Sequence, residues 1–313
     1  MRNFKILESP EVIKESIRLK RCVYNNVHYN DSYPLSVIST ITALENYIKS
    51  LKMDIDKKVL LAHKLAHTYR IAHLMLEYAI KYELSQRELA LYAIVGLLHD
   101  FGRIEEIMQT GNFAGISINH AQIGVEQLFD NGIGNPNSLI RQFVKTPDYD
   151  KAIYYAILFH NVLNLQKAVF ESKQTFSFSE RKMFARLRSA DKQDIMNFLT
   201  FTPTKTTIGV SEDELAKSLI TSSTLREFTN HNFKRYGGEE DYTDIRHWLS
   251  HYSFVFDPSN TRELLEWVKK SNWLDLYSKS IAFTEPDTVN KIAEIQKICS
   301  DFVENRLAAG MYE

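Results

Sequence analysis

The sequence predicts an all-α protein, and three observations support that fold class. Apolar residues recur mostly at helical spacing along the 313 residues of the chain. Glycine and proline are scarce, with 11 and 7 residues, which favours long helices with few breaks. We find no convincing run of alternating apolar and polar residues that would predict a strand.

The composition narrows the class of protein further. Hydrophobic residues make up 44% and charged residues 25%, and the formal net charge is -1, so nothing favours a nucleic-acid or membrane partner. Two cysteines exclude a disulfide framework and a cysteine-based zinc site. The N-terminus has no apolar signal core, and the longest apolar run, Leu89 to Leu98, is about half the roughly 20 residues that a membrane span needs. We therefore expect a cytoplasmic protein.

Helices follow from the apolar spacing and from capping residues. We expect them over residues 10–23, 34–51, 57–82, from Ser85 to about His99, and over 120–129, 150–165 and 179–199. Ser85 and Glu88 match a capping box, and Ser179 is the expected cap of its helix. The three glycines in residues 101–118 predict a loop, with Ser117 or Asn119 as the next cap.

The C-terminal third is expected to form a separate helical region. Residues 200–207 contain Pro203 and several threonines and are the best linker candidate. A second capping box starts at Ser211, and Gly237-Gly238 and Pro258 break the helices that follow. We divide the chain into an N-terminal helical extension (1–55), a core (56–205) and a C-terminal region (206–313).

The adjacent residues His99 and Asp100 are the most informative feature of the chain. They directly follow the apolar run that ends at Leu98, which is an unusual place for two polar groups. A buried, ionised carboxylate is costly unless it is paired or coordinates a metal. The pair therefore calls for a cation.

Further ligand candidates lie on other predicted helices: His67, His120, His160 and Asp191. A single histidine near an apolar helix face is more often a hydrogen-bonded core residue than a ligand. That interpretation would have to be repeated for each residue, whereas one metal site explains them all. Four imidazoles and two carboxylates suit Fe, Mn, Zn, Co or Ni, and helical bundles build such sites from facing helices.

The ordered set His67, His99-Asp100, His120, His160 and Asp191, with its flanking residues, resembles the HD-domain superfamily of metal-dependent phosphohydrolases. The flanking stretches are His-Thr-Tyr-Arg-Ile, Leu-His-Asp-Phe-Gly-Arg, Asn-His-Ala-Gln-Ile-Gly, His-Asn and Ala-Asp-Lys-Gln-Asp. The resemblance covers residues 60–200. It implies an all-helical bundle with the metal centre between helices.

The resemblance also implies a role for each residue. The family's basic metal site would be His67, His99, Asp100 and Asp191. His120 and His160 would be the extra ligands of binuclear members, and Asp100 would bridge two divalent ions (Fe, Mn, Zn, Co, Ni or Mg) that activate a water.

Cations near that centre would stabilise charge on the phosphoryl oxygens of the substrate. Arg103, where relatives often carry Lys or Arg, is the first candidate, and Lys192 is the second.

The expected substrate is a nucleotide or another small phosphate ester. The branch that hydrolyses cyclic di-GMP usually has a second histidine where this chain has Asn161, and then Gly-Tyr-Pro, so we do not expect that activity.

Two other functions stay open from the sequence. The same ligand set resembles the di-iron centre of myo-inositol oxygenase, which would bind a diol and O₂. Alternatively, the domain is a non-catalytic ligand-sensing module.

The aromatic residues of the C-terminal region, among them Trp248 and Trp273, are expected in a core or in a subunit interface, which leaves a homodimer open.

Overall fold

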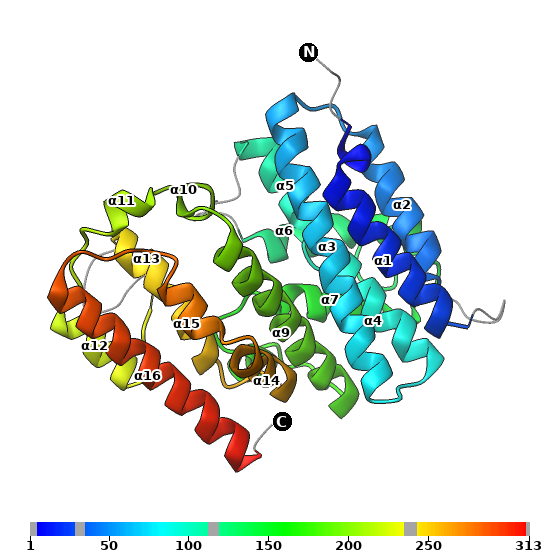
Figure 1. The fold of residues 1–313 in the computed structure, drawn as a ribbon. Coiled ribbons are helices and arrows are strands. Elements are labelled where there is room, and N and C mark those ends of the chain that lie inside the picture. The colour runs from blue at the N-terminus through cyan, green and yellow to red at the C-terminus, as the bar shows by residue number, and fades with distance from the viewer. Residues whose placement is uncertain (1–4, 29–34, 112–118, 235–242, 311–313) are drawn as a thin grey trace. The chain divides into compact units, whose positions relative to one another are not determined.

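The computed structural model describes residues 5–28, 35–111, 119–234 and 243–310 (Figure 1). The described residues form helices and turns without a strand, so the all-α prediction is confirmed. The α-helices are α1 (Pro10–Asn26), α2 (Val37–Ser50), α3 (Ile55–Lys81), α4 (Gln86–Leu98), α5 (Phe101–Thr110), α6 (His120–Leu128), α7 (Asp150–Phe159), α8 (Leu165–Glu171), α9 (Phe178–Phe201), α10 (Thr204–Thr207), α11 (Glu212–Leu215), α12 (Ser222–Thr229), α13 (Asp244–Ser250), α14 (Arg262–Lys270), α15 (Trp273–Ser278) and α16 (Pro286–Ala309). Short 3-10 helices are η1 (Ile6–Glu8), η2 (Leu139–Gln142), η3 (Pro147–Tyr149) and η4 (Tyr252–Phe256).

The chain forms two compact units, residues 1–190 and 191–313. It passes from the first to the second inside α9. Residues 200–207, predicted as a linker, hold the end of α9 and the one-turn helix α10. The helices α1 and α2 pack within the first unit, where Lys20 of α1 bonds Glu45 of α2 at 3.1 Å. The three-part division of the chain stays a prediction.

The first unit is built around α3 and α4. Every residue of α4 from Leu89 to Leu98 is buried, as expected for a helix that is apolar all round. The predicted capping box of Ser85 and Glu88 starts this helix. Gly96 allows a close crossing, because a Cβ there would lie 2.6 Å from the Cα of Ala72 on α3. The two central helices therefore lie nearly in backbone contact.

The prediction of a loop over residues 101–118 is wrong for its first part, which forms α5. Gly102 does not mark a turn but serves helix packing. A Cβ at Gly102 would lie 2.0 Å from the carbonyl oxygen of His120 and 2.6 Å from the nitrogen of Gly124. The glycine thus lets α5 touch α6. Asn119 caps α6 as predicted, accepting from the Gln122 nitrogen at 3.3 Å, whereas Ser117 lies outside the described residues.

Two helix ends differ from the prediction. The helix expected over 150–165 ends at Phe159, and α8 starts after Asn164, whose side chain accepts from the Lys167 nitrogen at 2.8 Å. Asn164 is a capping residue that interrupts an otherwise apolar pattern. The cap before α9 is Ser177 rather than Ser179, since the Ser177 hydroxyl accepts from the Glu180 nitrogen at 3.2 Å.

Aromatic side chains form the core of the second unit. The ring of Tyr277 stacks on Trp248 and on Trp273, with ring centroids 4.8 and 4.9 Å apart. The indole of Trp273 donates to the Met196 carbonyl at 2.8 Å. These residues are therefore core residues, one of the two predicted roles. The break at Pro258 is confirmed, whereas Gly237-Gly238 lies outside the described residues.

Among the described residues, none of the helices is at once long and apolar enough to reach across a bilayer.

A buried histidine on α3 predicts a pH-dependent stability. Burial, with Arg18 adding to it, lowers the pKa of His73 to about 4. Between that value and the unfolded value near 6.5, the unfolded chain binds more protons, so the free energy of unfolding falls as the pH falls. We expect His73→Gln to reduce the loss of stability between pH 7 and pH 5 by about 1–2 kcal/mol, measured by urea unfolding. His231→Gln, at an exposed histidine, is the control and should keep the pH dependence of the wild type. An equal pH dependence in wild type and His73→Gln would contradict the prediction.

Candidate metal centre

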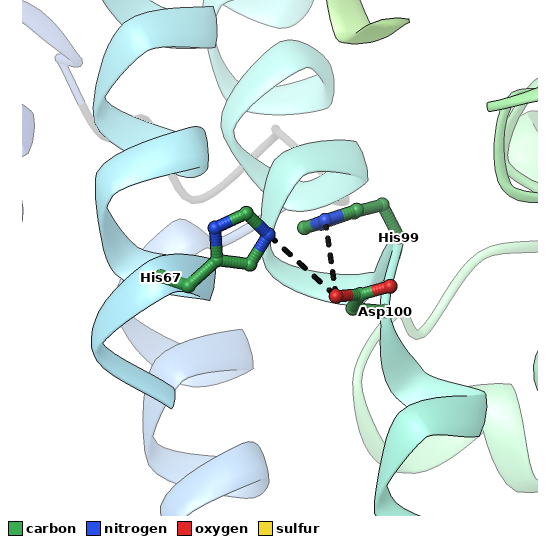
Figure 2. Close-up of side chains that lie close together, drawn as sticks. All are labelled: His67, His99 and Asp100. Carbon is green, nitrogen blue, oxygen red and sulfur yellow. Dashed lines mark ion pairs between the residues drawn. The ribbon is translucent and has the colours of Figure 1, made fainter. Parts of the chain in front are cut away.

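The middle of α3 and the ends of four other helices in the first unit bring polar side chains together. His67 lies on α3, and His99 and Asp100 form the bend between α4 and α5 (Figure 2). His120 is the first residue of α6, and His160 directly follows α7. His160 is thus at a helix end and not within a helix as expected. All five side chains are buried.

The two oxygens of Asp100 face different pairs of histidines. Its Oδ2 lies 3.6 Å from Nε2 of His67 and 3.7 Å from Nε2 of His99, as Figure 2 shows. Its Oδ1 lies 3.4 Å from Nε2 of His120 and 3.6 Å from Nε2 of His160. In each group the ligand atoms lie within 4.8 Å of one another. The carboxylate therefore stands between two potential metal sites, each with two imidazoles.

Backbone carbonyls fix the tautomers of two of these rings. Nδ1 of His99 lies 2.8 Å from the Gly96 carbonyl, and Nδ1 of His160 lies 2.6 Å from the Ile157 carbonyl. A carbonyl only accepts, so Nδ1 carries the proton in both rings. In the neutral rings Nε2 then keeps its lone pair and faces Asp100. This is the arrangement that orients histidine ligands in metal sites.

The charge state of the cluster also suits a cation. Burial alone would raise the pKa of Asp100, but Lys64 and the imidazoles, with His99 foremost, hold it well below its usual value. Burial lowers the pKa of His120 to about 2, although Asp100 opposes the change. An ionised Asp100 beside a neutral His120 is the protonation state in which both groups can bind a metal.

The spacing of the ligand atoms is consistent with metal coordination. Bonds of about 2.1 Å at tetrahedral or octahedral angles place two ligand atoms about 3.0–3.4 Å apart. The contacts of 3.4–3.7 Å to Asp100 lie within a few tenths of an ångström of that range, and the Nε2 atoms of His120 and His160 are 3.0 Å apart. The nitrogen and oxygen donors thus fit divalent transition metals.

Two cations of the first unit lie beside Asp100. The ammonium of Lys64 bonds Asp100 Oδ2 at 3.2 Å. Nε of Arg103 lies 3.8 Å from Asp100 Oδ1, as expected for a residue one turn into α5. Lys64 was not predicted from the sequence, although its position one turn before His67 places both side chains on the same side of α3.

The remaining predicted site residues, Asp191 and Lys192, lie on α9 in the second unit. Lys192 forms an ion pair with Asp257 and a hydrogen bond of 2.9 Å with Asn260 of the same unit. Asp191 is the first residue of this unit and is half-buried. Both stay predictions: Asp191 as a ligand and Lys192 as a substrate-binding cation.

Part of the first unit matches a known protein family. Residues 65–188 match the HD domain, so this part of the chain is an HD domain. The match contains all five clustered residues and ends three residues before Asp191. HD domains are generally metal-dependent hydrolases that bind divalent ions. Neither a search of the curated proteins nor a search of the solved structures found a match.

Proposed function

We propose that the protein is a metal-dependent phosphohydrolase that cleaves a phosphate ester of a nucleotide or of another small molecule. The observation that carries this proposal is the position of the Asp100 carboxylate. Each of its two oxygens faces a different pair of buried histidines. A carboxylate shared between two ligand pairs is the arrangement that two-metal hydrolysis needs.

The clustered residues would hold the ions and bind the substrate. His67, His99 and Asp100 would hold one ion, His120, His160 and Asp100 the other, with Asp191 as a further ligand. The ions would supply Lewis acidity and a water activated near neutral pH. Lys64 and Arg103, which lie within 3.2 and 3.8 Å of Asp100, would bind the phosphoryl oxygens as their negative charge grows.

The ion pair with Asp257 makes Lys192 a weaker candidate than these two cations for substrate binding. Because Asn161 and the lack of Gly-Tyr-Pro depart from the cyclic di-GMP branch, we propose another phosphate ester as substrate.

A phosphate-release screen tests the function. We expect the chain loaded with Mn²⁺ or Co²⁺ to release phosphate from at least one nucleotide or sugar phosphate, or to cleave a model diester. Chelation should stop the reaction, because the imidazoles and Asp100 would lose the ions that they hold. No turnover across such a panel with bound metal would contradict the proposal.

Metal analysis, O₂ uptake and chelation separate the two other functions. Iron bound after aerobic purification, together with O₂ uptake on addition of a diol, would favour an oxygenase. Behaviour that does not change on chelation, in a chain without bound metal, would favour a ligand-sensing module.

A further inference from the structure

A buried glutamate lies one helical turn beyond Arg103 on α5. The side chain of Glu106 is 0% exposed, although a charged carboxylate is rarely buried without a strong reason. Its neighbour Glu105 is half-buried and accepts hydrogen bonds from the side chains of Gln109 and Gln127. The two glutamates therefore differ in environment while sharing one helix.

The partner of Glu106 is the guanidinium of Arg103. Its Oε2 accepts from Nη1 of Arg103 at 2.5 Å, a short charge-assisted bond. Its Oε1 is buried and has no hydrogen-bond partner among the described residues. A carboxylate buried in this way is weak support for stability, because an apolar side chain of similar size often does as well or better. Stability alone is therefore a weak explanation for this bond to Arg103.

Arg103 lies between two carboxylates of the same unit. Nη1 bonds Glu106, and Nε faces Oδ1 of Asp100 at 3.8 Å. A free arginine side chain has about 2 kcal/mol of rotamer entropy, which binding of a phosphate would have to remove. The bond to Glu106 removes that freedom beforehand and fixes the guanidinium beside Asp100.

We propose that Glu106 is a positioning residue that holds the Arg103 guanidinium beside Asp100, ready for the oxygens of a phosphate group. The inference rests on the proposed function for its phosphate substrate. Glu106 does not touch that substrate and acts only through Arg103. It therefore has no effect of its own once Arg103 is absent.

A double-mutant cycle tests this coupling in the full-length, metal-loaded chain. Glu106→Gln keeps the size of the side chain and removes its charge, and Glu105→Gln is the matched control on the same helix. Two measurements are made: steady-state kinetics give kcat and KM for the best ester of the screen, and calorimetry gives the affinity for inorganic phosphate. Circular dichroism and metal content monitor the fold and the site.

We expect Glu106→Gln to lower kcat and phosphate affinity by about 10- to 100-fold, and Glu105→Gln to leave both unchanged. In an Arg103→Ala background, Glu106→Gln should have no further effect. Equal behaviour of the two glutamine variants, or an undiminished effect of Glu106→Gln without Arg103, would overturn the inference.

The two readouts distinguish the inference from the function on which it rests. Turnover that does not change in Glu106→Gln would support the hydrolase function and contradict the positioning role of Glu106. Without any turnover, a loss of phosphate affinity that depends on Arg103 would support the positioning role alone. If the wild type neither binds phosphate nor hydrolyses an ester, both proposals fail.

Discussion

Asp100→Asn is expected to abolish phosphate release, by at least about 1,000-fold in kcat, while the helical fold is retained. The substitution keeps the shape of the side chain but removes the negative charge on which both pairs of imidazoles converge. A neutral amide does not hold two divalent ions together, so both sites lose affinity. His99→Ala should cause a similar loss by removing one ligand.

The measurement is phosphate release at saturating metal, with circular dichroism to confirm the fold. Thermal melting with and without Mn²⁺ adds a second readout, because ligand binding stabilises the folded state by about 3 kcal/mol at 100 times its Kd. Wild type should show this rise in melting temperature, and Asp100→Asn should not. Asp148→Asn, at an exposed aspartate, is the control and should resemble the wild type. Wild-type turnover in Asp100→Asn and His99→Ala would mean that the site is assigned incorrectly.

Gly102→Ala is expected to destabilise the first unit and to displace His120. The new Cβ would lie 2.0 Å from the His120 carbonyl oxygen, so α5 and α6 would have to separate. We expect a loss of about 1–3 kcal/mol in the free energy of unfolding, together with loss of activity. Helix propensity alone would predict the opposite, a gain of up to about 1 kcal/mol.

Gly124→Ala is the matched comparison on the facing helix. Its Cβ would meet the Gly102 nitrogen at 3.1 Å, which a small shift relieves, so the effect should be clearly milder. Urea unfolding and metal content of both variants check the prediction. A Gly102→Ala variant that is more stable than wild type would show that the two helices do not pack as closely as described.

The sequence allowed much of the fold to be predicted, because capping residues and apolar spacing act locally. Ser85 and Asn119 cap helices as expected, and the apolar run before His99 forms a buried helix. Gly102 misled the prediction, since a glycine for a turn and a glycine for close helix contact look the same in sequence. Only the facing backbone at His120 distinguishes the two.

The structure brings together five of the six predicted ligands, whose role as ligands stays a prediction, whereas the residues around them were not predicted. Histidines and an aspartate in a family-like order point to a metal, and the structure brings five of them together. Lys64 and Glu106 escaped the prediction because lysine and glutamate are common on solvated helix faces. Their significance depends on burial and on the distances to Asp100 and Arg103, which long-range packing sets.

Metal content per chain tests the central claim most directly. After loading with Mn²⁺ and dialysis, elemental analysis should find about two ions in the wild type, about one in His160→Ala, and neither in Asp100→Asn. This order follows from one carboxylate shared between two pairs of histidines. A wild-type chain without bound metal, or an unchanged metal content in Asp100→Asn, would contradict the account.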